Sequence, residues 1–183
     1  LSHVDFENNT AGLYGGSVYI GESHASVLIS DVSVRGSSAD TGGGLYLGRF
    51  STDVRISSCN IASNRANSGG GLVSYVDGLT VRASIIDSNV AVVTFGGIYV
   101  EDASDYFFLQ ESSISNNVAG SAGGLRISRS FNITTESCEF LGNVASVGNG
   151  GALSVALSQA MLVRNTSFVE NSAAVAGGAV YVD

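Results

Sequence analysis

The chain has 183 residues, of which 44% are hydrophobic and 13% are charged, with 24 glycines and no proline. High apolar content with low charge excludes an intrinsically disordered chain, and the lack of proline excludes collagen. The net charge is −8, and all eight basic residues are arginine. This charge argues against a nucleic-acid partner, which requires a basic patch.

The first 20 residues contain a pattern that recurs along the chain. Phe6 is followed by Asn9 and Ala11, then by a glycine pair at 15–16 and an alternating strand at 18–20. Such self-similarity is the signature of a repeat architecture. The copies are spaced by 25 to 28 residues, and their first residues are Phe6, Val34, Ile61, Ile86, Ile114, Phe140 and Phe168.

Three positions of the repeat are nearly constant. The asparagines are Asn9, Asn64, Asn89, Asn117, Asn143 and Asn171, and the second copy has Ser37 in this place. The alanines are Ala11, Ala39, Ala66, Ala91, Ala119, Ala145 and Ala173. The glycine pairs are 15–16, 42–43, 69–70, 96–97, 123–124, 150–151 and 177–178.

Alternating apolar residues indicate short strands in every repeat. One strand precedes each later copy, from Val27/Ile29 to Met161/Val163; a short strand carries the Phe or Ile; and a third follows the glycine pair. No convincing helical apolar stripe occurs. The pattern predicts an all-β fold, a right-handed parallel β-helix of about seven coils with three strands each, stacked about 4.8 Å apart.

Stacking gives each constant position a physical role. The Phe or Ile side chains fill the bore. The asparagines form a hydrogen-bonded ladder at a turn, interrupted at Ser37, and tolerate the left-handed backbone there. The alanines lie where the wall narrows, and the glycine pairs supply a turn with positive φ before the third strand.

The chain begins and ends within a repeat. No start methionine or signal segment precedes the first copy, and no apolar run reaches the roughly 20 residues of a membrane span. We therefore expect one β-helix domain over residues 1–183, without a membrane span, that is a fragment of a longer chain.

The two cysteines, Cys59 and Cys138, occupy the same repeat position three coils apart. That separation is about 14 Å by the strand spacing, whereas a disulfide needs Cα atoms within about 7 Å. We expect two buried free thiols.

Three glycosylation sequons begin at Asn8, Asn132 and Asn165. They indicate either a secreted eukaryotic glycoprotein or chance matches in a chain rich in Asn, Ser and Thr. The sequence leaves both interpretations open.

Acidic and basic residues were considered as enzyme sites. Glu101, Asp102 and Asp105 could offer oxygen ligands to Ca²⁺, or form a solvated loop, which we favour. His3 and His24 lie in different parts of a coil and predict no catalytic site. Glu136 and Arg164 hold equivalent positions and predict an exposed cross-strand pair of small energetic value.

The outward position of the third strand is rich in tyrosine. Tyr19, Tyr46, Tyr99 and Tyr181 hold it in four coils, whereas the others have Val73, Arg126 and Ser154. Stacked tyrosines can bind sugar rings or a neighbouring rod, or can simply shield the strand ladder.

The repeat resembles that of the chlamydial polymorphic outer-membrane proteins, which combine GGA[ILV] and FxxN motifs. The resemblance rests on GGAL at 150–153, GGAV at 177–180 and FxxN at Phe6, Phe140 and Phe168, and it covers the whole chain. Similar repeats occur in extracellular proteins of algae and other protists. The resemblance implies a β-helical module at the cell surface with adhesive or structural work.

From these observations we expect an extracellular or cell-surface structural or adhesive module, with no catalytic site, metal or cofactor. Its partners would be other coils or subunits of a longer surface assembly. The alternatives are a non-catalytic glycan-binding module that uses the tyrosine column, and a carbohydrate-active β-helix enzyme. Acids or bases clustered across adjacent coils would favour the enzyme, whereas glycan binding that depends on the tyrosines would favour the binding module.

Overall fold

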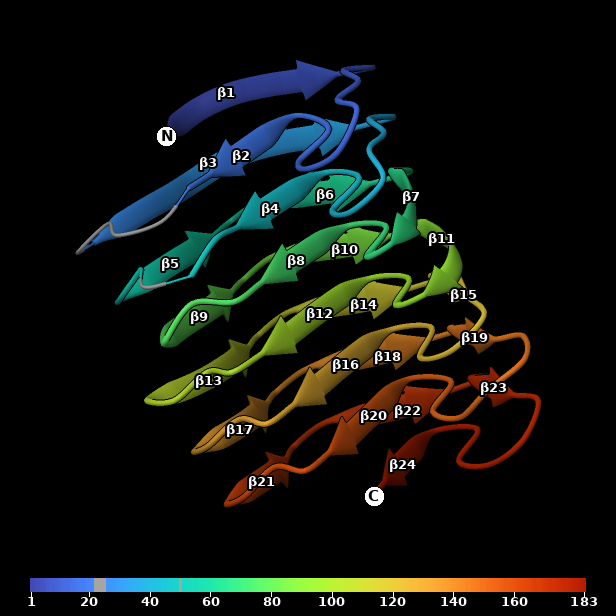
Figure 1. Cartoon of the computed structure of the whole chain (residues 1–183). Helices are drawn as coiled ribbons and strands as arrows, with labels where there is room; N and C mark the ends of the chain where they lie inside the picture. The colour runs from blue at the N-terminus through green and yellow to red at the C-terminus, as the bar shows by residue number, and fades with distance from the viewer. Residues whose placement is uncertain (22–25, 50) are drawn as a thin grey trace.

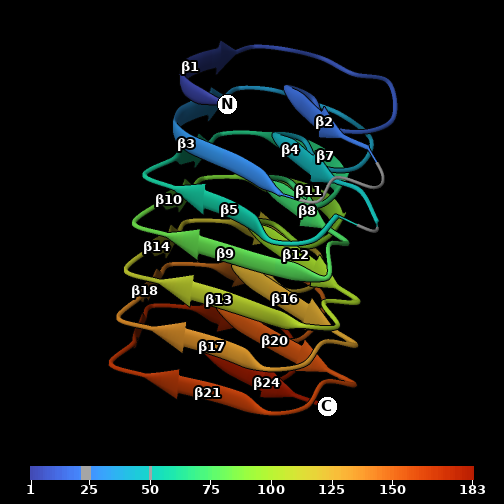
Figure 2. The same cartoon turned by 90° about the vertical axis from the view of Figure 1, so that its left-hand side faces the viewer.

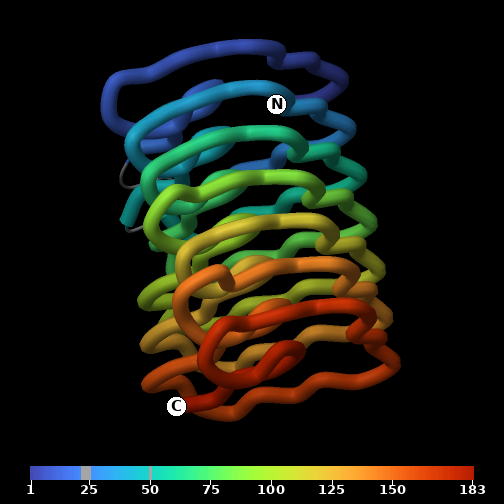
Figure 3. The backbone as a smooth tube through the Cα atoms, turned by 90° about the vertical axis from the view of Figure 1, so that its right-hand side faces the viewer, coloured from blue at the N-terminus to red at the C-terminus, as the bar shows by residue number. Residues whose placement is uncertain are grey.

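A computed structural model describes residues 1–21, 26–49 and 51–183, so His24 lies outside the described residues. The chain winds through seven coils that stack from the N-terminus at one end to the C-terminus at the other (Figure 1). The tube view shows that each coil lies directly on the next along the whole rod (Figure 3). The predicted parallel β-helix is confirmed.

All strands pair in parallel, and they form three sheets. The largest sheet has 12 strands, which cover two walls of the rod, and one wall faces the viewer in Figure 2. Its strands are β1 (Ser2–Glu7), β3 (Val27–Arg35), β5 (Val54–Ser57), β6 (Asn60–Ala62), β9 (Gly78–Arg82), β10 (Ile85–Asp87), β13 (Tyr106–Gln110), β14 (Ser113–Ser115), β17 (Ile133–Glu136), β18 (Glu139–Leu141), β21 (Met161–Arg164) and β22 (Ser167–Val169).

The other two sheets close each coil. The seven-stranded sheet contains β2 (Val18–Ile20), β4 (Leu45–Leu47), β8 (Leu72–Ser74), β12 (Ile98–Glu101), β16 (Leu125–Ser128), β20 (Leu153–Ala156) and β24 (Val180–Val182). The five-stranded sheet contains β7 (Arg65–Ser68), β11 (Val90–Thr94), β15 (Val118–Ala119), β19 (Val144–Ala145) and β23 (Ser172–Ala173). This short strand at the alanine position was not predicted, so coils 3 to 7 have four strands and not three.

Equivalent positions of successive copies pair in register. Ile61 lies opposite Ile86, and Ile86 lies opposite Ile114. The column continues through Phe140 to Phe168, whose rings stack with centroids 5.0 Å apart. These side chains fill the bore, as the sequence predicted, because one coil cannot bury its own apolar face and must rest on its neighbours.

The asparagines form a continuous ladder through the interior of coils 3 to 7. The Nδ2 of Asn89 donates to Oδ1 of Asn117 at 3.0 Å and to the backbone carbonyl of Ile61 at 2.9 Å. Its Oδ1 accepts from both the backbone N–H and the Nδ2 of Asn64. The same bonds repeat at Asn117 and Asn143, and the Nδ2 of Asn171, in the last coil, donates to the carbonyl of Phe140. The ladder thus satisfies polar groups that would be costly to bury alone.

The first two coils depart from the ladder. Asn9 is exposed, and its Nδ2 donates to Ser17 Oγ at 3.4 Å, while its backbone N–H reaches Ser37 Oγ. The serine side chain is too short to extend the amide row. The left-handed residue at this turn is also not the asparagine itself but its predecessor, as at Ser63, Ser88 and Asn116. The asparagine has to point inward, so the preceding residue makes the turn.

The glycine pairs serve two different needs. The first glycine has positive φ in five coils, as at Gly42 with φ of 67°. In coils 4 and 5, however, Phe95 and Ala122 hold the positive-φ place just before the pair, which corrects the prediction there. The position that directly follows the positive-φ residue is glycine in every coil, for a steric reason. A Cβ on Gly70, for example, would lie 2.6 Å from the carbonyl oxygen of Gly96 in the next coil.

Replacing one ladder asparagine should destabilise the rod strongly. We expect Asn89→Ala to lower the free energy of unfolding by more than about 2 kcal/mol, because it removes four hydrogen bonds in a buried site. Urea denaturation followed by circular dichroism measures the change. Asn67→Ala is the matched control: it removes an exposed amide, and we expect a loss within about 0.5 kcal/mol. Equal losses in the two variants would contradict the ladder's role.

Candidate functional site

The first candidate site is a group of aromatic side chains on the outside of the seven-stranded sheet, here called the aromatic surface. Its members span coils 1 to 4 and are Tyr14, Tyr19, Tyr46, Tyr75, Phe95 and Tyr99. They are brought together because β2, β4, β8 and β12 are neighbours in this sheet. Aromatic rings at these separations attract one another beyond their buried area.

The structure brings only some of the expected tyrosines together. Tyr19 and Tyr46 stack with centroids 5.5 Å apart. Tyr99 is only 8% exposed and is linked to them through Tyr75, with a centroid separation of 6.1 Å between Tyr75 and Tyr99. Tyr181 lies three coils beyond Tyr99, in β24.

The third-strand position that we expected to face solvent is buried or partly buried in the middle coils. Val73 and Ser154 are fully buried, and Arg126 is partly buried with its Nη1 donating to Ser154 Oγ. The exposed aromatic area is therefore concentrated at coil 1, where Tyr19 is 55% and Tyr14 is 46% exposed. A continuous tyrosine track along the rod is not present.

Three members of the aromatic surface were missed by sequence reasoning. Tyr14 and Phe95 lie in the turn before the third strand, and Tyr75 lies directly after it. They do not share one repeat position, so no column of the repeat contains them. Only the turn geometry, including the positive φ of Phe95, places their rings beside the strand tyrosines.

An ion-pair cluster borders the aromatic surface. Asp102 accepts from Arg49 at 3.0 Å and from Arg129 Nε at 2.8 Å, and Arg129 also pairs with Glu101. The Arg49 guanidinium lies 5.2 Å from the ring centroid of Tyr75, a cation–π distance. Arg49 and Arg129, which are far apart in the sequence, meet here from coils 2 and 5.

The acidic residues that could have offered oxygen ligands to Ca²⁺ have other neighbours in the folded chain. The carboxylates of Glu101 and Asp102 face arginines, and Asp105 is an exposed residue whose backbone N–H bonds to Asp77. Across residues 1–21, 26–49 and 51–183, no group of three or more His, Cys, Asp or Glu side chains could hold a metal ion. His3 is exposed and lies 3.9 Å from Asp31.

The ionisable groups of this region are perturbed in consistent directions. The hydrogen bond from Arg129 holds the pKa of Asp102 below its usual value. Burial, together with the nearby Glu101 charge, raises the pKa of Tyr75 to about 12. Burial and a hydrogen bond to Glu101 raise the pKa of Tyr99 as well. The phenols of Tyr75 and Tyr99 are therefore neutral at neutral pH, and the carboxylate of Asp102 is charged.

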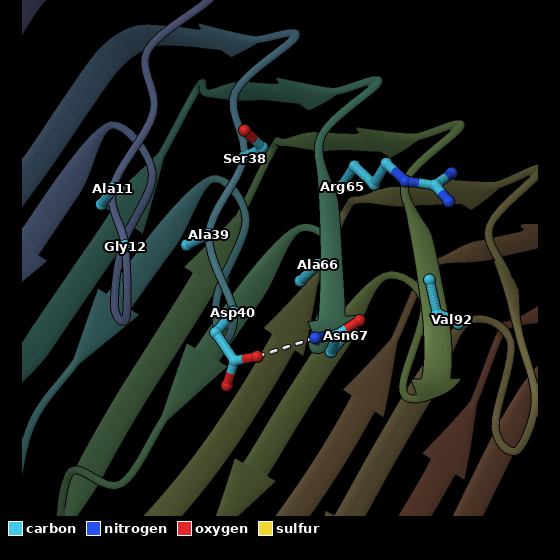
Figure 4. A pocket seen from close by; sticks show the side chains of 9 residues that line it. All are labelled: Ala11, Gly12, Ser38, Ala39, Asp40, Arg65, Ala66, Asn67 and Val92. Carbon is cyan, nitrogen blue, oxygen red and sulfur yellow. Dashed lines mark hydrogen bonds between the residues drawn. The ribbon is translucent and has the colours of Figure 1, made fainter.

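The second candidate site is a shallow cavity of about 370 Å³ on the outside of the alanine column in coils 1 to 4 (Figure 4). Ala39 and Ala66 are among the residues that line it. Polar side chains lie around it, with Asp40 and Asn67 joined by a hydrogen bond of 2.7 Å. The remaining lining residues are Ala11, Gly12, Ser38, Arg65 and Val92.

The two cysteines are buried in the structure, whereas the three sequon asparagines are exposed. Cys59 and Cys138 are buried and free, and each thiol donates to the carbonyl two residues earlier, at 3.2 Å for Cys59 and 3.1 Å for Cys138. Burial raises the pKa of both thiols. Asn8, Asn132 and Asn165 are all exposed, and all have positive φ at corners of the coil.

The predicted exposed pair between neighbouring coils is also formed. Glu136 and Arg164 lie opposite each other in β17 and β21, with an ion-pair distance of 2.8 Å. A second such pair joins Arg82 and Glu111 at 3.0 Å. Exposed pairs of this kind contribute little to the stability of the fold.

The comparisons with known proteins agree with this architecture. A family model described as a right-handed β-helix region matches residues 1–183. The chain therefore belongs to the right-handed β-helix family, and this match confirms the predicted hand. No curated protein and no solved structure matches the chain. In the part of the chain that the structure describes, no helix is long and apolar enough to cross a membrane.

The raised pKa of Tyr75 makes a prediction about alkaline stability. The folded chain holds this proton more tightly than the unfolded chain does, so the free energy of unfolding should fall as the pH rises from 10 to about 12. We expect Tyr75→Phe to reduce this slope. Urea denaturation at a series of pH values measures the slope, and an unchanged slope in the variant would show that Tyr75 is not its source.

Proposed function

We propose that this β-helix is a non-catalytic structural or adhesive module of an extracellular or cell-surface protein. The observation that carries the proposal is that its polar groups mainly hold neighbouring coils together. The asparagine ladder, the ion pairs of Asp102 and the pair of Glu136 with Arg164 all run between coils. Such a rod offers long, regular outer faces.

Two further features support an extracellular place. The resemblance to surface-protein repeats covers the whole chain, and the three sequon asparagines are exposed. The partners under this proposal are other coils or subunits of a surface assembly.

Location can be tested on the source cells. Antibodies raised against the folded chain should stain intact, unpermeabilised cells, and staining only after permeabilisation would contradict the proposal. The intact mass of the native protein, measured before and after enzymatic deglycosylation, tests the sequons separately. We expect a fall in mass that Asn8→Gln, Asn132→Gln and Asn165→Gln together abolish.

A second candidate function is glycan binding by the aromatic surface. It is favoured by the exposed rings of Tyr14 and Tyr19, because sugar rings stack on free aromatic faces. Faces between stacked rings, as between Tyr19 and Tyr46, are already occupied. The tyrosines of coil 1 are therefore better candidates than Tyr99 or Tyr181.

The glycan hypothesis predicts loss of binding in one specific variant. On a glycan array, the double variant Tyr14→Ala/Tyr19→Ala should lose the signals of the native chain, because it removes the exposed rings. Phe108→Ala is the control, since Phe108 stacks on Tyr106 in a different sheet. Signals that survive in the double variant would exclude this surface.

A carbohydrate-active enzyme is the third hypothesis, and the contacts support it least. The most concentrated carboxylates, Glu101 and Asp102, are held by Arg129 and Arg49. A general acid–base pair needs carboxyl groups that are free to exchange protons with a substrate.

A further inference from the structure

Exposed valines follow the alanine column in coils 4 to 7, and this surface is here called the valine corner. Val92 and Val93 lie in β11, whereas Val147 and Val175 lie in the loops after β19 and β23, and these segments follow one edge of the rod (Figure 1). Val147 is 72% exposed and Val175 is 71% exposed. Neighbouring exposed apolar side chains of this kind mark an interaction surface.

Coil 5 has a groove at the place where the adjoining coils have valine. Its residues there are Gly120 and Ser121, and the groove has a volume of about 290 Å³. Val92 and Val93 line the groove from coil 4, and Val147 lines it from coil 6. The valine corner therefore presents a groove in coil 5 directly beside a projecting valine in coil 6.

The backbone of the valine corner is held by bonds between coils. The N–H groups of Val147 and Gly148 both donate to the carbonyl of Gly120 at 2.8 Å, and the N–H of Val175 donates to the carbonyl of Gly148 at 3.2 Å. These bonds fix the loops of coils 6 and 7 against the preceding coil, so the projecting valine and the groove are pre-organised. The same N–H groups are not available to an added peptide strand, so an occupant must be recognised through side chains.

The distribution of charge favours a second copy of this chain as the occupant. The chain has a net charge of −8, so two copies repel each other where their charged faces meet. The valine corner avoids this repulsion because it is built from segments without Asp, Glu, Lys or Arg, namely residues 88–100, 117–125, 143–163 and 171–182. A partner recognised by its charge would find no opposite charge in these segments.

We propose that two copies of this chain associate through the valine corner, antiparallel to each other and related by a two-fold axis between coils 5 and 6. This axis sets coil 6 of each copy against coil 5 of the other, so that each Val147 enters the groove at Gly120 of the second copy. It also sets each Val175 against Val92 and Val93 of the second copy. An axis at coil 5 would instead oppose Val93 and Val147, and an axis at coil 6 would oppose the two Val147 side chains.

The extent of the valine corner suits a closed dimer. In coils 2 and 3 the place of Val93 is taken by Thr41 and Ser68, so the apolar surface ends at coil 4. A two-fold pair uses the same surface of both copies and leaves no further copy of it open, in contrast to the head-to-tail contacts that build filaments. The inference rests on the proposed function and deepens it, because it names one subunit contact of the surface assembly.

Sedimentation velocity of the full chain tests the association. We expect a concentration-dependent dimer, and in Val147→Ser a dissociation constant at least about tenfold higher, because each dimer loses two buried valine side chains. Leu162→Ser is the matched control: it removes an exposed apolar side chain of β21, on a different wall, and should leave the dissociation constant unchanged. A native chain that stays monomeric at about 1 mM, or equal weakening by both variants, would overturn the proposal.

Cysteine cross-linking tests the register of the two copies. Val93→Cys and Val175→Cys chains, mixed under mild oxidation, should form a covalent dimer on a non-reducing gel, because the axis sets these positions opposite each other. Each variant alone should not, since its two cysteines then lie three coils apart, about 14 Å, beyond the reach of about 7 Å for a disulfide. The native Cys59 and Cys138 are buried and do not compete.

Two cross-linking results would overturn this arrangement: no covalent dimer from the mixture, or equal cross-linking by one variant alone. Neither result, nor a monomer in sedimentation, would change the staining of intact cells. The subunit contact and the proposed location can therefore fail independently.

Discussion

Axial contact between successive coils is the constraint on which the whole molecule depends. A single coil exposes both its apolar side chains and its backbone polar groups, and only the coils above and below can cover them. The buried asparagine ladder shows this most directly. Each internal amide bonds to the next asparagine and to a backbone carbonyl in the preceding coil. Because an unpaired buried amide is costly, the ladder fixes the register of the coils as well as their stability.

The same constraint explains where variation is tolerated. Positions that touch the next coil are nearly uniform, such as the second glycine of the turn, where a Cβ would collide with a carbonyl of the following coil. Outward positions differ from coil to coil. The aromatic surface and the polar cavity therefore belong to coils 1 to 4, whereas exposed valines such as Val147 and Val175 occupy the loops of later coils. Both candidate sites therefore lie where the coils deviate from the repeat.

The two candidate sites differ in how their side chains are used. In the aromatic surface and its ion-pair cluster, most groups contact one another, and these contacts join coils 1 to 5 on the outside. The rings left free are those of coil 1. In the cavity, Asp40 is bonded to Asn67, whereas Arg65 has no ion pair with a carboxylate among the described residues.

Local rules and the repeat period determined the coil, the apolar column from Phe6 to Phe168, the inward asparagines and the two buried thiols, because these depend only on which residue recurs at which spacing. The fourth short strand, the left-handed residues before the asparagines and the positive φ of Phe95 and Ala122 required the actual backbone path. The convergence of Arg49 and Arg129 on Asp102 and the burial of Tyr99 were decided by tertiary structure alone. They depend on how side chains from different coils meet on an outer face, where no repeated position specifies the neighbour.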